Sequence, residues 1–166
     1  MLTLRSIAAR VRFLFAQTAD LDPELLALVK AHPAGPALLA EPGVGPVVAA
    51  QLVVSWSHRG RVRSEAAFAA LAGAAPLEAS SGQRVRHRLI AAATETSTGA
   101  LHTVAITRMR CHAETRDYET RRTAEGKTHR DIRRSLKRAF ARRLYRRIQT
   151  ATRPAARLPE EHSSAA

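Results

Sequence analysis

Two serines followed by regularly spaced arginines form the first group of residues whose types and spacing suit chemistry. The segment Ser80–Gly82 predicts a turn that leads into a short strand, and Arg84, Arg86 and Arg88 follow at alternate positions. Because side chains alternate between the faces of a strand, these arginines are expected on one face. Three aligned guanidinium groups beside a serine turn suit a phosphate. An ordinary turn with a solvated basic edge is the alternative that these residues leave open.

A second candidate is the glycine-rich turn between two apolar segments, Pro42-Gly43-Val44-Gly45-Pro46. Short helices on either side of it make a helix-hairpin-helix pattern. Gly43 and Gly45 permit positive φ and close approach of the backbone, with Val44 between them, to a ligand. The N–H groups at the start of the following helix suit a phosphate oxygen. A plain αα-hairpin that binds nothing is the alternative.

The third candidate is a long, strongly basic helix predicted over residues 128–149. Apolar residues recur at every fourth position and predict one buried stripe: Ile132, Leu136, Phe140, Leu144 and Ile148. Basic residues cover its other faces, and the residues proposed to contact nucleic acid are Arg133, Arg134, Lys137 and Arg138. Because neutralising acids are nearly absent here, a merely solvated basic face is the weaker interpretation.

The charge of the chain points to the same class of partner. The 166 residues carry a net charge of +13, and the excess is uneven: residues 1–75 hold 7 Lys and Arg against 5 Asp and Glu, whereas residues 76–166 hold 20 against 9. This asymmetry favours a polyanion, nucleic acid before an acidic membrane surface or an acidic protein. The single cysteine, Cys111, excludes an intrachain disulfide, and no His or Cys spacing suggests a metal site. We expect no membrane span and no secretory leader.

These candidates lie on a chain that we expect to be mainly α, in three parts. Residues 1–30 form a helical, coiled-coil-like linker, in which Leu4, Ile7, Val11 and Leu14 make one stripe and Pro23 begins a second helix. Residues 31–150 form the domain that holds the hairpin turn, the extended serine segment and the basic helix. Further helices are expected from Ser64 to Leu71 and from about residue 99 to residue 116. Residues 151–166 are expected to be a disordered tail.

Several ordered motifs together resemble the transposases of the insertion-sequence 110/116/902 family. The resemblance covers roughly residues 25–148. Its motifs are Pro-Gly-Val-Gly-Pro (42–46), Arg-Ser-Glu-Ala-Ala-Phe-Ala-Ala-Leu-Ala-Gly (63–73), Ala-Pro-Leu-Glu-Ala-Ser-Ser-Gly (75–82), Arg-His-Arg-Leu (86–89), Ala-Leu-His-Thr (100–103), Arg-Arg-Thr-Ala-Glu-Gly-Lys (121–127) and Leu-Lys-Arg (136–138).

The resemblance implies DNA transposition by a serine-dependent recombinase. Such enzymes have an N-terminal nuclease domain with metal-binding acids and a C-terminal transposase domain with a catalytic serine, which matches Ser81 here. The match is to the C-terminal domain alone, so we expect a truncated chain that is inactive by itself, with Mg²⁺ only in the missing domain and no cofactor in this one. The implied partners are DNA, a guide RNA and a second or full-length transposase copy, in the bacterial cytoplasm at the nucleoid. A non-catalytic nucleic-acid-binding module or a decayed fragment is the alternative.

One segment departs from the family pattern in a way that suggests a shifted reading frame. Residues 91–99 read Ala-Ala-Ala-Thr-Glu-Thr-Ser-Thr-Gly, whereas the family usually shows a basic stretch similar to Arg-Gly-Gly-Asp-Arg-Asp-Ile-Asn-Arg. The codons CGC-GGC-GGC-GAC-CGA-GAC-ATC-AAC-CGG encode that basic stretch. Read one nucleotide later, they give Ala-Ala-Ala-Thr-Glu-Thr-Ser-Thr and the first two bases of a glycine codon. We infer two compensating single-nucleotide changes around this segment.

The codons of the gene test this inference. We expect that shifting the reading frame of residues 91–99 back by one nucleotide restores a stretch with three arginines. Sequencing the locus provides the measurement, and the codons of residues 121–127, read with the same shift, are the control that should give no family motif. A shifted frame that encodes no basic stretch at 91–99 contradicts the inference.

Overall fold

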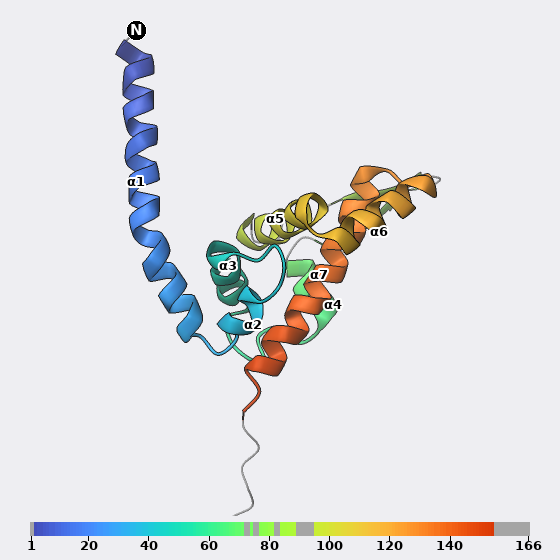
Figure 1. Cartoon of the computed structure of the whole chain (residues 1–166). Helices are drawn as coiled ribbons and strands as arrows, with labels where there is room; N and C mark the ends of the chain where they lie inside the picture. Colours follow the sequence, from blue (N-terminus) through green and yellow to red (C-terminus); the bar gives the residue numbers. More distant parts are fainter. Residues whose placement is uncertain (1, 72–73, 75–76, 82–83, 89–94, 155–166) are drawn as a thin grey trace, which may run out of the picture.

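Helices make up most of the described chain, as the sequence predicts. A computed structural model describes residues 2–71, 74, 77–81, 84–88 and 95–154 (Figure 1). The helices are α1 (Leu2–Ala31), α2 (Gly35–Leu39), α3 (Pro46–Trp56), α4 (Glu65–Leu71), α5 (Glu95–Cys111), α6 (Ala113–Ala124) and α7 (His129–Ala151). Two strands, β1 (Leu77–Ser81) and β2 (Arg84–Arg88), pair as an antiparallel ribbon. The predicted strand over residues 84–88 is therefore one strand of a two-stranded ribbon, whereas Ser80 and Ser81, for which the sequence predicts a turn, are the last two residues of the other strand.

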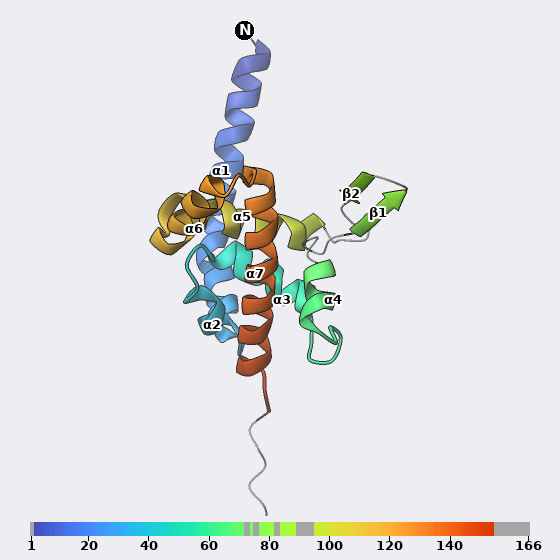
Figure 2. The ribbon, with the colours of Figure 1, turned by 90° about the vertical axis from the view of Figure 1, so that its right-hand side faces the viewer.

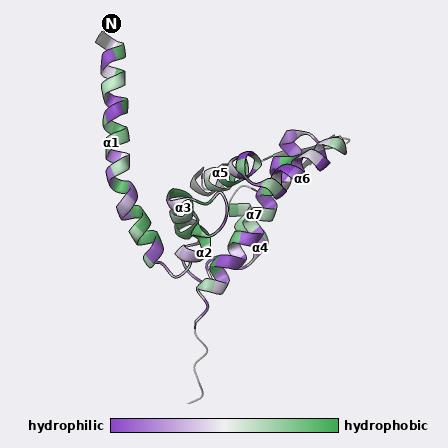
Figure 3. Cartoon of the chain, viewed as in Figure 1, coloured by the Kyte–Doolittle hydropathy of each residue, from purple (hydrophilic) through white to green (hydrophobic). Residues whose placement is uncertain are grey.

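The hydrophobic core lies where α3, α5 and α7 meet, and the shorter helices close it from the sides. Helix α5 packs against both α3 and α7, while α4 and α2 pack against α7. The largest fully buried side chains come from different helices, among them Leu52 on α3, Phe68 on α4, Leu101 on α5 and Ile132 on α7. Figure 3 shows the hydrophobic residues gathered on α3 and the hydrophilic ones along α6 and α7.

Helix α7 has the apolar stripe that its sequence predicts. All five predicted stripe residues are buried, and Ala141 joins them. The helix begins at a side-chain cap, because the hydroxyl oxygen of Thr128 accepts a hydrogen bond from the backbone N–H of Asp131 at 3.2 Å. The carboxylate of Asp131 also lies in the first turn, where it is favoured by the helix dipole. Sequence pattern and tertiary packing therefore agree over the whole length of α7.

The prediction that Pro23 begins a second helix is wrong. Helix α1 runs without a break from Leu2 to Ala31 and contains Pro23. It bends below its midpoint (Figure 1), as expected where a proline removes one backbone N–H. Because Pro23 and the preceding turn are exposed, the carbonyl oxygen that loses its partner is open to solvent, and the helix continues.

The prediction of one helix over residues 99–116 is also wrong in its extent. Helix α5 begins earlier, at Glu95, and ends at Cys111, and His112 has extended backbone angles, φ −100° and ψ 117°. A further helix that the sequence analysis did not predict, α6, begins at Ala113. The tail predicted to be disordered lies mostly outside the described residues. Within the described residues, no helix combines the length and the hydrophobicity that crossing a membrane requires.

Candidate nucleic-acid interface

The turn between α2 and α3 packs against α5 on one side and is open on the other. Gly43 has a φ of 81°, and a Cβ atom there would lie 3.0 Å from Cγ of Arg108 and 3.3 Å from the carbonyl oxygen of Val104. Val44 is buried. Gly45, in contrast, is exposed at the N-cap of α3, and a Cβ atom there would meet nothing within 4 Å. Of the three predicted binding residues in the turn, Gly45 has the backbone most open to a ligand.

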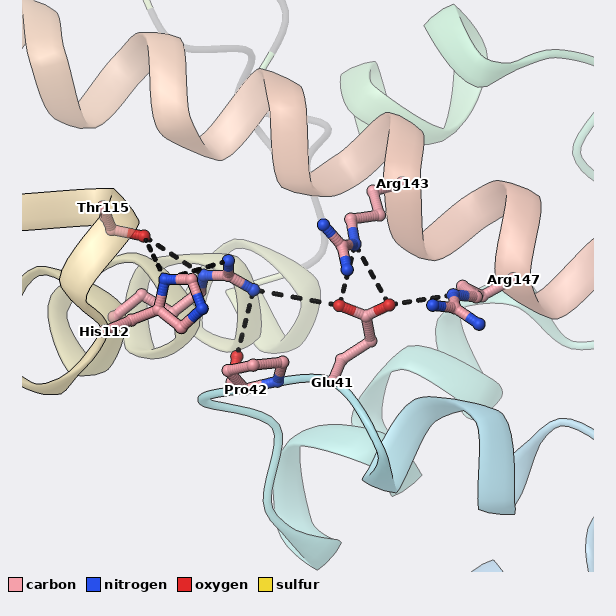
Figure 4. Close-up of polar contacts among 7 residues, drawn as sticks. Glu41, Pro42, His112, Thr115, Arg143 and Arg147 are labelled. Carbon is pink, nitrogen blue, oxygen red and sulfur yellow. Dashed lines mark hydrogen bonds and ion pairs between the residues drawn. The ribbon is translucent and has the colours of Figure 1, made fainter. Parts of the chain in front are cut away.

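A buried carboxylate holds this turn in place. The side chain of Glu41 is only 3% exposed, and three guanidinium groups surround it (Figure 4). Nε of Arg143 lies 2.8 Å from its Oε2, Nε of Arg147 lies 2.8 Å from its Oε1, and Nη1 of Arg108 lies 3.8 Å from its Oε2. Arg108 belongs to α5 and the other two belong to α7. The carboxylate therefore fixes the turn to both long helices.

Arg108 is the most buried of these arginines, with a side chain 6% exposed. Its guanidinium lies 4.7 Å from the ring centre of Phe140, and its Nε donates a hydrogen bond to Oγ1 of Thr115 at 3.4 Å. Its Nη1 donates to the carbonyl oxygen of Pro42 at 3.5 Å. Burial lowers the pKa of Arg108, and the nearby positive charge of Arg143 lowers it further, whereas Glu41 opposes both. Arginine stays charged under all ordinary conditions, so the positive charge of Arg108 requires the negative charge of Glu41.

Sequence analysis missed Glu41 and Arg108. Two features of the sequence could have drawn attention to Glu41. It directly precedes the glycine-rich turn, and it is one of only five acidic residues in residues 1–75. Arg108 stands among the apolar residues of a helix that the sequence predicts to be partly buried. A charged residue at such a position requires a partner of opposite charge.

The outer face of α7 carries a row of four arginines at four-residue spacing, Arg134, Arg138, Arg142 and Arg146. This spacing corresponds to a rise of about 6 Å per step along the helix, on the side opposite the buried stripe. Arg134 pairs with Asp131 at 3.6 Å, and Nη2 of Arg146 donates to Glu65 at 3.1 Å. In the part of the chain that the structure describes, Arg138 and Arg142 have no ion-pair partner within 4 Å.

The other two residues predicted on α7 lie beside this row. Arg133 is half-buried, and its Nε donates to the carbonyl oxygen of His129 at 3.3 Å. Lys137 is also half-buried, and burial lowers its pKa. The structure therefore joins Arg134 and Arg138, which are also half-buried, with the exposed Arg142 and Arg146 in one row, and places Arg133 and Lys137 on its flank.

The ribbon of β1 and β2 aligns the predicted serine with the predicted arginines. The register pairs Ser81 with Arg84, Ala79 with Arg86 and Leu77 with Arg88. Residues that are directly opposite in an antiparallel pair share a face, as do alternate residues along one strand. Ser81, Arg84, Arg86 and Arg88 therefore occupy positions on one face. Gly82 lies outside the described residues.

The ribbon and the hairpin turn do not form one site within this chain. Figure 2 shows the ribbon to the side of the helices, beyond α4, whereas α2 and the following turn lie on the other side of α7. Among the described residues, no group of three or more His, Cys, Asp or Glu side chains has an arrangement that could hold a metal ion. The sequence-predicted residues thus fall into two separate regions, one on the ribbon and one on the turn and α7.

Comparison with known proteins identifies the class of protein to which these features belong. Residues 36–120 match the model of a family of transposases, and this match covers just over half of the chain. The chain belongs to the transposase IS116/IS110/IS902 family. This confirms the resemblance stated from the sequence motifs.

One curated relative is similar over a longer range. The insertion element IS110 uncharacterized 43.6 kDa protein of Streptomyces coelicolor is 31% identical over 125 residues, which are 75% of this chain and 31% of that protein. The chain therefore spans about a third of the length of the curated relative that it matches.

The buried carboxylate yields a prediction about stability. We expect Glu41→Gln to lower the free energy of unfolding by about 3 kcal/mol, because the substitution leaves the buried Arg108 without its compensating charge. Urea denaturation followed by circular dichroism provides the measurement. Glu65→Gln is the matched control, since Glu65 pairs with Arg146 at the surface, and we expect its unfolding midpoint to stay that of the parent chain. Equal midpoints for Glu41→Gln and the parent chain would contradict the structural role of Glu41.

Proposed function

We propose that this chain binds DNA during transposition and that Ser81 is the nucleophile of strand exchange. The observation that carries the proposal is the register of the ribbon, because it places Ser81 opposite Arg84 and on the same face as Arg86 and Arg88. A serine at such a position shares one face of the ribbon with three positions that hold arginine. Membership of a transposase family makes DNA the substrate that this arrangement suits best.

Contact with the DNA backbone is assigned to α7 and to the turn. The outward row of arginines supplies positive charges about 6 Å apart along a rigid helix, and among the described residues Arg138 and Arg142 have no ion-pair partner within 4 Å. Such charges bind phosphates and release their counterions. At Gly45 the N-terminal end of α3 is exposed and no side chain caps it, so its free N–H groups suit a phosphate oxygen.

The reaction assigned to Ser81 is a transesterification. Its hydroxyl oxygen attacks the phosphorus of a DNA phosphodiester, an Oγ–P bond forms, and the bond from phosphorus to one deoxyribose oxygen breaks. The deoxyribose oxygen leaves as a free hydroxyl after it takes up a proton. The hydroxyl of a second DNA end then attacks the phosphoserine and releases Ser81. Arginines at positions 84, 86 and 88 stabilise the additional negative charge on the five-coordinate phosphorus.

Among the residues that the structure describes, no group of three or more His, Cys, Asp or Glu side chains could hold a metal ion. The family resemblance implies acids and Mg²⁺ in a nuclease domain, and the described residues of this chain do not fit that ion. We therefore assign no step to a metal held by them. The base that accepts the proton of Ser81 is assigned to the part of a full-length transposase that this chain does not match, supplied by another copy.

A non-catalytic nucleic-acid-binding module is the second candidate function. It is favoured by the separation of the ribbon from the turn and α7 (Figure 2), since phosphate binding at α7 requires no serine chemistry. A guide RNA has the same backbone phosphates as DNA, so it is the competing ligand for that surface.

The role of α7 predicts the salt dependence of DNA binding. We expect the double variant Arg138→Ala/Arg142→Ala to bind duplex DNA more weakly and to reduce the slope of log K against log salt concentration by about 2, one for each lost phosphate contact. Fluorescence anisotropy at several salt concentrations provides the measurement, with RNA as a competitor.

The matched control is Arg5→Ala/Arg12→Ala, which removes the same charge from exposed positions on α1. We expect its slope to stay near that of the parent chain. Equal loss of slope in both double variants would mean that net charge alone attracts DNA, and that α7 is no specific contact surface.

The role of Ser81 predicts a covalent intermediate. We expect the chain, mixed with a full-length transposase of the family, Mg²⁺ and nicked donor DNA, to form an adduct that mass spectrometry locates at Ser81. Ser81→Ala should abolish the adduct and leave DNA affinity unchanged, because the hydroxyl takes part in chemistry only. Ser80→Ala is the control, since Ser80 pairs with Val85 on the other face of the ribbon. An adduct that survives Ser81→Ala would leave the binding module as the function.

A further inference from the structure

Two arginines of α7 each hold Glu41 through a single nitrogen atom. Nε of Arg143 donates to Oε1 of Glu41 at 3.0 Å, and Nε of Arg147 donates to the same oxygen at 2.8 Å (Figure 4). A guanidinium group has five N–H donors in one plane, and all but one of them belong to its two Nη atoms. Within the described part of the chain, neither arginine makes a hydrogen bond through an Nη atom. Among the described residues, most donors of both groups therefore remain without a partner.

The same two arginines are accessible from solvent. The side chains of Arg143 and Arg147 are each 51% exposed, whereas the carboxylate that they hold is 3% exposed. Their positions are four residues apart, which corresponds to about 6 Å along the helix. Each directly follows a member of the arginine row on the outer face, Arg142 or Arg146. One residue is a rotation of about 100°, so the pair lies on the strip of α7 between that row and the turn that contains Glu41.

The cluster around Glu41 has more positive than negative charge. Three guanidinium groups meet one carboxylate, which leaves an excess of two positive charges. In the residues that the structure describes, Glu41 is the one acid within 4 Å of Arg143 or Arg147. Besides burial, the positive charge of Arg143 lowers the pKa of Arg108, so the cations of the cluster repel one another. An anion that reaches the two exposed arginines from solvent would reduce this repulsion.

Glu41 also determines how the two exposed arginines are oriented. A guanidinium group is planar and rigid, so a hydrogen bond at Nε fixes the direction of the end that carries the Nη atoms. Groups that are already oriented lose less conformational entropy when they bind a ligand. Arg138 and Arg142 lack such support, because among the described residues they have no ion-pair partner within 4 Å. The buried acid therefore distinguishes one pair of arginines on α7 from the others.

The open end of an oriented guanidinium group suits a phosphate, because two N–H donors in one plane match two phosphate oxygens. We propose that Arg143 and Arg147 bind phosphate groups of the DNA backbone through their Nη atoms, and that Glu41 is the positioning residue that holds them in the required orientation. This inference rests on the DNA binding proposed above and adds to it two contacts that the outer row does not include. Glu41 thus has a role in DNA binding in addition to its role in holding the turn.

A substitution that keeps the charge tests this proposal in the full chain. In Arg143→Lys/Arg147→Lys, each lysine can still pair with Glu41, but its single nitrogen cannot also offer a planar pair of donors to a phosphate. We expect duplex DNA to bind about tenfold more weakly, as for the loss of a charge-assisted hydrogen bond. The slope of log K against log salt concentration should stay that of the parent chain, because no charge is lost. Fluorescence anisotropy provides both measurements, and Arg5→Lys/Arg12→Lys at exposed positions on α1 is the control that should keep the parent affinity.

A second variant tests the positioning role of Glu41. Glu41→Asp keeps every charge but draws the carboxylate back by one methylene group, so the two arginines lose their orientation. We expect the same loss of DNA affinity at an unchanged salt slope. All affinities are measured at a temperature at which circular dichroism shows the helix content of the parent chain, so that unfolding does not contribute. Parent affinity in Glu41→Asp overturns the positioning role.

The unfolding midpoint separates DNA binding from a purely structural role of the two arginines. If Arg143→Lys/Arg147→Lys lowers the midpoint but keeps the parent affinity for DNA, the two arginines only compensate the buried acid, and the proposal is overturned. A loss of affinity for an RNA competitor without a loss for duplex DNA overturns it as well. A parent chain that does not bind DNA overturns the proposed function together with this inference, whereas equal DNA binding by the parent chain and the lysine variant overturns this inference alone.

Discussion

The arrangement of this molecule depends on the charge of one buried side chain, Glu41. Its carboxylate joins a turn near the start of the domain to α5 and to α7, which lie far away along the sequence. Removing a carboxylate from water is unfavourable unless opposite charges compensate for it. Three arginines compensate here, and one of them is itself removed from water. The positions of the turn, α5 and α7 therefore depend on one another through these ion pairs.

The same interaction explains how a helix as basic as α7 is accommodated. It contains nine Lys and Arg residues and one Asp, and many of its positive charges repel one another at four-residue spacing. Acids from other elements relieve part of this repulsion: Glu41 meets Arg143 and Arg147, and Glu65 meets Arg146. The buried apolar stripe holds α7 against the core although its other basic residues still repel one another. A bound polyanion would neutralise the positive charge of these other residues.

The elements that could be predicted from sequence are those determined by local pattern. The stripe of α7 follows from its four-residue period, and the start of α4 follows from Ser64, whose hydroxyl accepts a hydrogen bond from the N–H of Ala67 at 3.1 Å. The alternation of residues 84–88 predicted a strand. Helix α1 passes through Pro23 because solvent surrounds that turn, and α5 ends at Cys111 without a glycine or proline to mark the end. Both depend on surroundings that local pattern does not contain.

The candidate site was predictable to a similar extent. The basic residues could be found from the sequence because Lys and Arg greatly outnumber Asp and Glu in the second half of the chain. That Gly43 and Val44 face the protein, and Gly45 does not, depends on where α5 lies. The anchoring role of Glu41 was not predictable, since its partners on α7 lie 102 and 106 residues away along the chain and nothing local distinguishes it from a surface acid.

The contacts of Glu41 also show that the segment matched by the family model differs from the segment that must fold as one unit. The segment that the family model matches covers residues 36–120 and includes Glu41 and Arg108, whereas Arg143 and Arg147 lie on α7, beyond its end. A protein cut at the boundary of the shared segment would retain the buried acid and lose two of its three counter-charges, together with the stripe that closes the core. The unit of folding is thus longer than the segment that the family model matches, because α7 supplies two counter-charges to a turn that it meets only in three dimensions.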